Sequence, residues 1–331
     1  MPLAVQQTAL DSRVARHYDL IPTRKLPGPM LNLNRAAQFW TRRKSVRCLL
    51  VGLPILAAMV LSWVTFAQPF VQRDVESARE MDSYRGGQAY TWTNDERFKK
   101  DVFTFVRLKY HVDGEHGYGR DPDYRWMIDA PDSELNFSYR LQQVTSLKVD
   151  PNPKWLAITN AELFNYPFVY IVEPGRLTFR EEELPILRRY LLNGGFLMCD
   201  DFWGDVDWKN FSSELKRLFP DREPRDLQLD HPIFNCVFPL KEKPQVPGVP
   251  WGIRHEFTGI SYEQAHNPGA EEPHYRAILD DKGRIMVILC HNTDMGDGWE
   301  REGESEYYFH EFSEKFAYPL GINIVFYAMT H

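Results

Sequence analysis

Two adjacent acids, Asp200 and Asp201, follow the apolar run "FLMC" at residues 196–199. Carboxylates act as general acids and bases, and they are the oxygen ligands that hard divalent cations prefer. Side chains of neighbouring strand residues point to opposite faces, so these two acids lie side by side only if the strand has already ended. We expect at least one of them to accept hydrogen bonds from loop amides, and we treat both as candidate catalytic residues.

Polar side chains also follow the other apolar runs that we expect to be strands. His291 comes after "MVILC", where a histidine is either a base or a satisfied interior side chain, and it is our third candidate catalytic residue. The segment "DMGDGWERE" lacks full EF-hand spacing and predicts a tight turn. The candidate ligand-binding residues are Arg120, Arg125, Trp126, Glu173, Trp203, Asn292, Asp294, Asp297 and Trp299.

No complete cofactor motif accompanies these residues. The glycines Gly114, Gly117 and Gly119 match neither dinucleotide-binding nor Walker spacing. Cys199, Cys236 and Cys290 show no paired metal spacing and are expected to be buried free thiols. No cofactor is evident, but the acids are compatible with a divalent metal.

Alternating strand and helix patterns position these residues. The expected strands are almost wholly apolar, which is typical of a parallel sheet covered by helices on both faces. Together with the alternation of strands and helices, this indicates the α/β class with a doubly wound, mainly parallel sheet. Ligands of such sheets bind outside the carboxyl ends of the strands. The expected strands are 102–110, 155–159, 167–175, 196–200, 274–281 and 283–291, and the expected helices are 133–147, 178–195, 207–220 and 314–329.

The N-terminal part of the chain has a different character. Residues 1–47 carry nine Lys/Arg against two Asp, a charge of +7, and residues 48–67 are twenty residues without a charge. That length fits a transmembrane helix or uncleaved signal anchor, which we favour over a signal peptide cleaved near Ala67. Met30 is an alternative start. We expect residues 68–100 to be a linker and 101–331 to be the α/β domain.

Charge predicts the location of that domain. Because the whole chain carries −7, residues 48–331 carry −14, which excludes nucleic acid as a partner of the domain. Positive residues before an apolar run stay in the cytoplasm, so the C-terminal domain is expected outside it, anchored in a bacterial inner membrane.

Several long segments resemble a known family. "ELNFSYRLQQVTSL", "YPFVYIVEPG", "RRYLLNGGFLMCDDFWG", "CHNTDMGDGWERE" and "AYPLGINIVFYAMTH" are similar to the bacterial domain of unknown function 4159, from about residue 102 to the C-terminus. The resemblance implies a flavodoxin-like sheet akin to class I glutamine amidotransferases, often in envelope proteins, with no established activity.

Glutaminase chemistry does not fit these residues. Cys199 precedes two carboxylates instead of lying between glycines in an elbow, and no His-x-Glu follows it. Negative neighbours raise a thiol pKa and disfavour the reactive thiolate.

Two hypotheses for the function remain. The first, which we favour, is a membrane-tethered module whose acidic and aromatic rim binds a sugar-like ligand, a peptide or another envelope protein. The alternative is an acid/base or metal-assisted hydrolase that uses Asp200 or Asp201 with His291.

Overall fold

The computed structural model describes residues 75–81, 90–98, 101–112 and 122–331. The chain divides into two units, residues 1–72 and 73–331, and all described residues belong to the second. The predicted transmembrane segment 48–67 and the candidate Arg120 lie outside the described residues. Of the helices within these ranges, none has the length and apolar character that crossing a bilayer requires.

A seven-stranded sheet organises the second unit, in the order β2-β1-β3-β4-β7-β6-β5. The five strands β2, β1, β3, β4 and β7 are parallel, β6 is antiparallel to β7, and β5 is antiparallel to β6. The α/β class is therefore confirmed, with a mixed sheet. The strands are β1 (Val106–Lys109), β2 (Lys154–Ala157), β3 (Phe168–Val172), β4 (Phe196–Phe202), β5 (Arg225–Asp226), β6 (His274–Leu279) and β7 (Ile285–His291).

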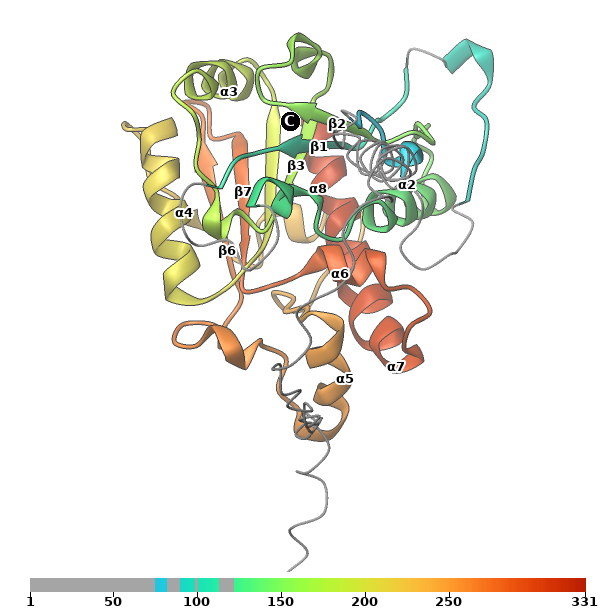
Figure 1. Cartoon of the computed structure of the whole chain (residues 1–331). Helices are drawn as coiled ribbons and strands as arrows, with labels where there is room; N and C mark the ends of the chain where they lie inside the picture. Colours follow the sequence, from blue (N-terminus) through green and yellow to red (C-terminus); the bar gives the residue numbers. More distant parts are fainter. Residues whose placement is uncertain (1–74, 82–89, 99–100, 113–121) are drawn as a thin grey trace, which may run out of the picture. The chain divides into compact units, whose positions relative to one another are not determined.

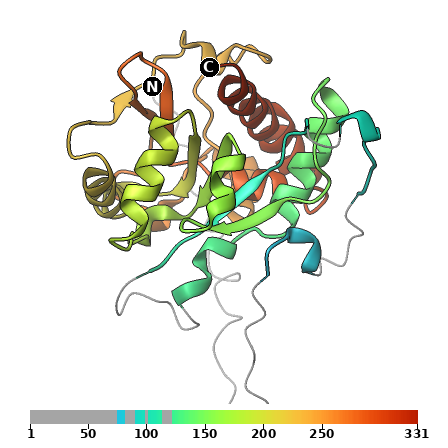
Figure 2. The ribbon, with the colours of Figure 1, turned by 90° about the horizontal axis from the view of Figure 1, so that it is seen from above.

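Helices cover both faces of the sheet, so its central strands are buried on both sides (Figures 1 and 2). One hydrophobic core lies between the sheet and α2, α6 and α8, and the other lies between the sheet and α3 and α4. The helices are α2 (Asp132–Val144), α3 (Glu183–Leu192), α4 (Gly204–Leu218), α5 (Val249–Thr258), α6 (Met295–Glu300), α7 (Glu306–Tyr308) and α8 (Tyr318–Thr330), and the π-helical η8 (Phe309–Ala317) precedes α8.

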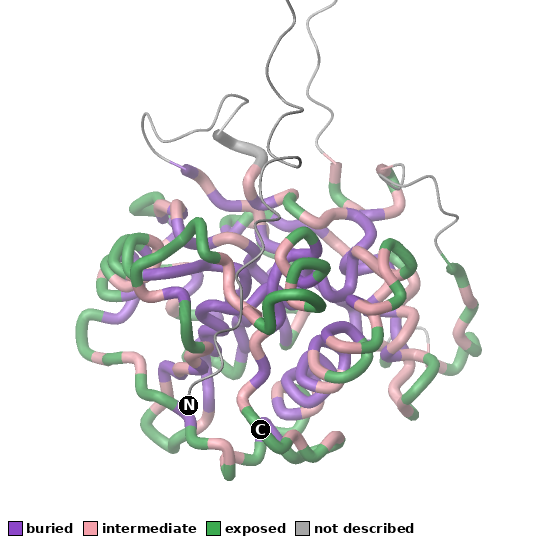
Figure 3. Tube along the Cα trace, turned by 90° about the horizontal axis from the view of Figure 1, so that it is seen from below, coloured by how far each residue is buried: buried purple, intermediate pink, exposed green. Residues whose placement is uncertain are grey.

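Short 3-10 helices fill several of the connections, and Figure 3 shows buried residues along the inner segments with exposed residues on the outer turns. These 3-10 helices are η1 (Ala78–Glu80), η2 (Glu96–Phe98), η3 (Pro122–Met127), η4 (Ala161–Asn165), η5 (Pro174–Arg176), η6 (Pro232–Phe234) and η7 (Gln264–His266).

Some predicted boundaries were wrong. Thr178 does not cap a helix, because its backbone N–H bonds to His111 in an isolated β-bridge, and α3 begins at Glu183. Asp207 does not precede α4. It lies in the first turn, where its carboxylate accepts a hydrogen bond from the backbone N–H of the N-cap residue Trp203 (3.3 Å). The predicted tight turn at residues 294–302 contains the helix α6.

Parts of the predicted linker pack against the domain. The Trp155 N–H donates to the Glu76 carbonyl (2.8 Å), and Ser77 forms an antiparallel bridge with Lys154 on the edge strand β2. Farther along, the Trp92 indole donates to the Val149 carbonyl (2.8 Å). The contacts of Glu76 and Ser77 cover an edge that would otherwise expose unpaired backbone groups.

Candidate functional site

A cavity of about 310 Å³ opens at the carboxyl ends of the parallel strands. Its walls come from the connections after β1, β3, β4 and β7 and from the segment around the start of α5. Open α/β sheets bind ligands in this position. The cavity is lined by seven acids (Asp129, Glu173, Asp201, Asp207, Glu263, Asp294 and Asp297), by Arg125, Arg176 and Arg301, and by Trp203, Trp251 and His266, among others.

Asp129 is held in place by a buried arginine. Arg107, on β1 and fully buried, donates to the carbonyls of Trp126 (3.0 Å) and Ile128 (2.8 Å) and forms an ion pair with Glu134 (2.7 Å). This network fixes the loop that ends in Asp129, whose backbone is left-handed (φ 63°). The Asp129 side chain is buried, and its Oδ2 has no hydrogen-bond partner among the described residues.

Asp201 enters the cavity because β4 is interrupted there. Its backbone is left-handed (φ 58°), and the pairing of β4 with β7 shifts register between Cys199 and Phe202. The regular alternation of side chains is broken at this point, and Asp200 and Asp201 therefore reach different surroundings. The indole of Trp203 donates to Asp201 Oδ1 (2.9 Å) and orients the carboxylate.

Asp294 and Asp297 come from the start of α6. Asp294 is the N-cap, and its Oδ1 accepts from the Asp297 N–H (2.7 Å). Asp297 Oδ2 accepts from the Val249 N–H at the start of α5 (2.7 Å). Asp294 therefore caps α6, and Asp297 ties α6 to the start of α5.

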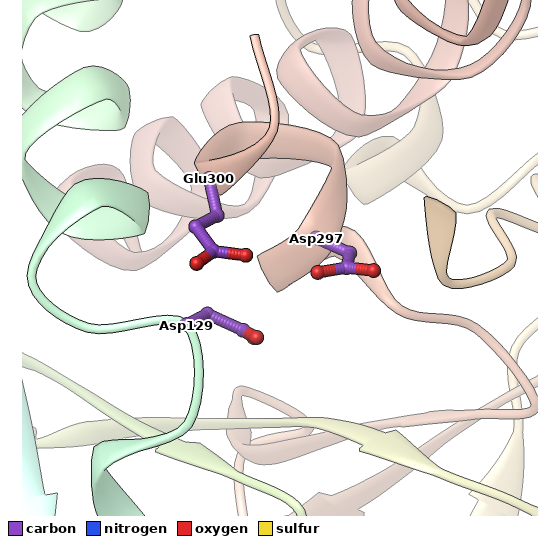
Figure 4. A group of neighbouring side chains, drawn as sticks. All are labelled: Asp129, Asp297 and Glu300. Carbon is purple, nitrogen blue, oxygen red and sulfur yellow. The ribbon is translucent and has the colours of Figure 1, made fainter. Parts of the chain in front are cut away.

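These carboxylates form two groups that share one residue. Oxygens of Asp129, Asp201 and Asp294 lie within 4.8 Å of one another, and so do oxygens of Asp129, Asp297 and Glu300. Figure 4 shows the second group, with Asp129 in its loop facing the two acids of α6. Clustered carboxylate oxygens are the donors that Ca²⁺, Mg²⁺ and Mn²⁺ select. The site can therefore hold a divalent cation.

Burial and repulsion between neighbouring carboxylates raise the pKa values of these acids above those of aspartates in water. Burial raises the pKa of Asp129, Asp201 and Asp294 well above the ordinary aspartate range, and neighbouring carboxylates raise each pKa further. A bound cation would act in the opposite direction, because positive charge favours the ionised carboxylate.

Two glutamates that line the cavity have pKa values near neutrality. Burial raises the pKa of Glu173 to about 7, although its ion pair with Arg125 opposes the shift. Burial also raises the pKa of Glu263 to about 7, against the hydrogen bond that Glu263 accepts from the Gly248 N–H (2.9 Å). Such groups accept or release a proton easily at neutral pH.

The candidate catalytic residues do not come together in one cluster. Asp200 is fully buried beside the cavity, where its Oδ2 accepts from the backbone N–H groups of Met295 (2.8 Å) and Gly296 (3.1 Å). It is the acid that binds loop amides. Burial raises the pKa of Asp200 to about 8.

His291 does not line the cavity. Its Nδ1 accepts from Arg276 (3.1 Å), since a guanidinium only donates, and its Nε2 bonds with the Gly204 carbonyl (3.1 Å). Its ring stacks on Phe202 and Trp208. Both ring nitrogens are therefore engaged in holding the end of β7 to the start of α4, as in a satisfied interior histidine.

Some of the predicted ligand-binding residues line the cavity and others do not. Arg125, Glu173, Trp203, Asp294 and Asp297 line the cavity. Asn292, Trp126 and Trp299 do not: Asn292 bonds backbone groups of Gly204, Gly269 and Glu272, Trp126 packs on Trp155, and Trp299 is fully buried in the core.

Three acids of this site were not among the residues predicted from the sequence. Asp129 follows the loop after β1, and the acid in "MIDAPD" is the signal that could have indicated it. Glu300 lies one helical turn after Asp297, so α-helical spacing would have placed the two on one face. Glu263 comes from an irregular segment that carries no pattern.

Cys199 lies in the middle of β4 and is fully buried. Burial raises the pKa of its thiol well above the usual range, and Asp200 raises it further. These surroundings suppress the thiolate that a glutaminase nucleophile needs.

Comparison with known proteins gives a family and no activity. No curated protein matches the chain. Residues 104–329, more than half of the chain, match the family model described as "Domain of unknown function (DUF4159)", so the resemblance found in the sequence is confirmed and the chain belongs to that family.

Proposed function

We propose that the α/β domain is a ligand-binding module whose cavity holds a divalent cation. The observation that carries the proposal is the group formed by Asp129, Asp201 and Asp294, with oxygens within 4.8 Å of one another inside a cavity. Three separate chain segments supply these oxygens. A cation there relieves the repulsion that raises the pKa of all three acids.

A small, oxygen-rich ligand suits the rest of the cavity. A cation accepts hydroxyl, carboxylate or phosphate oxygens into its open positions. Arg125 and Arg301 line the cavity and carry planar pairs of N–H groups that suit carboxylates and phosphates, and Trp203 and Trp251 add aromatic rings to its lining. Sugar-like ligands and peptides with a carboxylate have these features.

The strand order supports the finer description of the fold. Numbered by themselves, the five parallel strands follow the order 2-1-3-4-5, which is that of flavodoxin-like sheets. The order reverses between β1 and β3, and Asp129 and Glu173 follow these two strands. The cavity thus lies at the position where flavodoxin-like sheets bind their ligands.

The domain functions outside the cytoplasm in this proposal. Residues 48–67 anchor it in the membrane, and the basic residues 1–47 stay inside. Millimolar calcium or magnesium outside the cell would then be available to a site of modest affinity.

The test is thermal unfolding of the chelator-treated full-length protein with Ca²⁺, Mg²⁺ or Mn²⁺ added. A cation at about 100 times its dissociation constant stabilises the folded state by about 2.7 kcal/mol. Asp294→Asn should remove this stabilisation. The matched control is Asp205→Asn, which removes an exposed acid of α4 that does not line the cavity.

No change in melting temperature with any of the three cations up to about 10 mM would contradict the proposal, since weak extracellular sites have millimolar dissociation constants. Equal loss of stabilisation in both variants would also contradict it, because general screening of charge would then explain the effect.

A second candidate function is metal-assisted hydrolysis, favoured by the two glutamates whose pKa values are about 7. In this hypothesis Glu263 is the general base, a role that His291 cannot take with both nitrogens engaged. Turnover of bis(p-nitrophenyl) phosphate or p-nitrophenyl glycosides with Mn²⁺, lost in Glu263→Gln, would support hydrolysis. No turnover by the wild type would leave binding as the function.

A further inference from the structure

We propose that the cavity holds two divalent cations and that Asp129 bridges them. This inference rests on the proposed function and extends it from one cation to a binuclear centre. The first cation lies among Asp129, Asp201 and Asp294, and the second lies among Asp129, Asp297 and Glu300.

Asp129 is the only residue common to the two carboxylate groups found in the described part of the chain. Its side chain is buried, and Oδ2 has no hydrogen-bond partner among the described residues. A buried carboxylate oxygen without a hydrogen-bond partner destabilises the folded protein, and a bound cation would supply the missing partner. Two-metal sites hold their ions about 3.5–4 Å apart, a span that one bridging carboxylate covers.

The backbone of this loop favours the same conclusion. Arg107 binds the carbonyls on either side of Met127, and the backbone of Asp129 is left-handed. A non-glycine residue in that conformation is strained, and the strain is retained where surrounding structure fixes it. Asp129 is therefore held facing the acids of α6 (Figure 4).

The formal charge of the acids favours two cations over one. Seven carboxylates and three guanidinium groups line the cavity, and Glu300 of the second group adds an eighth carboxylate beside it, which gives a formal charge of −5 when the acids are ionised and His266 is neutral. Burial lowers the pKa of His266, so its ring is neutral at pH 7. One divalent cation leaves −3, and two divalent cations leave −1. A low-dielectric cavity penalises any remainder.

Arg301 makes the two positions unequal. It contacts Asp297 Oδ1 (3.2 Å) and Glu300 Oε2 (2.6 Å), and so partly neutralises the second group. None of the ion pairs within the described residues joins Arg301 to Asp201 or Asp294 of the first group. We therefore expect the first position to fill first, and the second to fill at higher cation concentration because the cation must displace Arg301 from Asp297 and Glu300.

The experiment is a Mn²⁺ titration of the chelator-treated full-length protein, followed by electron paramagnetic resonance. Free Mn²⁺ is counted at room temperature, and a spin-coupled pair is detected at low temperature, because two bridged ions exchange-couple whereas an isolated ion gives six lines. The expected result is two Mn²⁺ per chain, with coupling developing only as the second ion binds.

Glu300→Gln separates the two positions. It should weaken the second ion by about 10- to 100-fold, the range for lost metal-site partners, and abolish coupling while leaving the first ion in place. Glu304→Gln is the matched control, since it removes another acid that contacts Arg301 but belongs to neither carboxylate group, and it should retain the coupled pair. If Glu300→Gln does not fold, the coupling in the wild type decides by itself.

The outcomes distinguish the two proposals. One bound Mn²⁺ with a six-line spectrum would overturn the binuclear centre and leave the single-cation site standing. Two ions without coupling would overturn the Asp129 bridge. No bound Mn²⁺ would overturn the proposed function and this inference together.

Discussion

Asp200 and Asp201 are neighbours in sequence, but one carboxylate bonds backbone groups and the other lines the cavity. Asp200 accepts two backbone N–H groups at the start of α6, and this anchors the helix. Asp201 lines the cavity, where its carboxylate adds charge to an already acidic space. Residues held for a ligand are often not optimal for stability. The two acids should therefore respond differently to the loss of charge.

Asp201→Asn should leave the metal-free protein as stable as the wild type, or raise the free energy of unfolding by about 0.5–2 kcal/mol, because it removes one charge from the cluster. The amide oxygen can still accept from the Trp203 indole. Stabilisation by Ca²⁺ or Mn²⁺ should disappear. Urea unfolding at pH 8, with and without cation, measures both quantities.

A loss of about 0.5–2 kcal/mol in the metal-free variant, the range for a lost cap, would instead identify Asp201 as a structural residue. Unchanged stabilisation by the cation would lead to the same conclusion.

His291 should make folding sensitive to acid. Burial lowers its pKa to about 3, whereas an unfolded histidine has a pKa of about 6.5. Between these values the unfolded chain takes up a proton that the folded chain does not, so its contribution to stability is present above about pH 6.5 and is lost as pH falls toward 3.

His291→Gln should reduce this dependence, because the glutamine side chain does not titrate. The free energy of unfolding, measured by urea at several pH values from 7 to 4, should fall less steeply in the variant, by about 1 kcal/mol per pH unit. Parallel curves for the two proteins would show that the pKa of His291 is the same in the folded and unfolded chains.

At the scale of elements, the site depends on backbone conformations at strand ends. The non-glycine residues with positive φ in the described part of the chain are Asp129, Glu173, Asp201 and Asn292, and each lies in or just after a segment that leaves the carboxyl edge of the sheet. Sparsely populated conformations often cluster at binding sites, where neighbouring structure holds them. Here β3, β4 and β7 support Glu173, Asp201 and Asn292, and Arg107 of β1 supports the loop of Asp129.

The close approach of α6 to the Asp129 loop provides a test at this scale. A Cβ added at Gly296 would overlap Asp129 Oδ2. Gly296→Ala should therefore displace Asp129 and weaken cation binding by about 10-fold or more, even though every carboxylate is retained. Isothermal titration with Mn²⁺ measures the change.

Alanine also has a higher helix propensity than glycine by about 1 kcal/mol, so the metal-free variant should not lose helix stability for that reason. Cation affinity equal to that of the wild type would mean that the position of Asp129 does not matter.

At the scale of the whole molecule, the charge asymmetry between residues 1–47 and the rest of the chain predicts topology. A phosphatase reporter that folds only outside the cytoplasm, fused after residue 331, should be active, and the mature protein should retain residues 48–67. A mature N-terminus at Gln68 would change the anchor into a cleaved signal. Activity of a cytoplasmic reporter in the same fusion would contradict export.

The sequence by itself determined the α/β class, the family and the side of the sheet on which the acids gather. Apolar strands separated by amphipathic helices allow few other arrangements, and the carboxyl ends of parallel strands share one edge. Acids at the carboxyl ends of such strands, as Asp201 and Glu173 are, are therefore brought near one another by topology alone.

Only the tertiary structure decided which residues meet. Asp201 reaches the cavity because β4 breaks register at that residue, and Asp129 because the buried Arg107 holds its loop. His291 and Trp299 carry the right chemistry but point into packed interior. Side-chain direction depends on bulges, left-handed residues and long-range hydrogen bonds, and contacts between residues distant in sequence set all three.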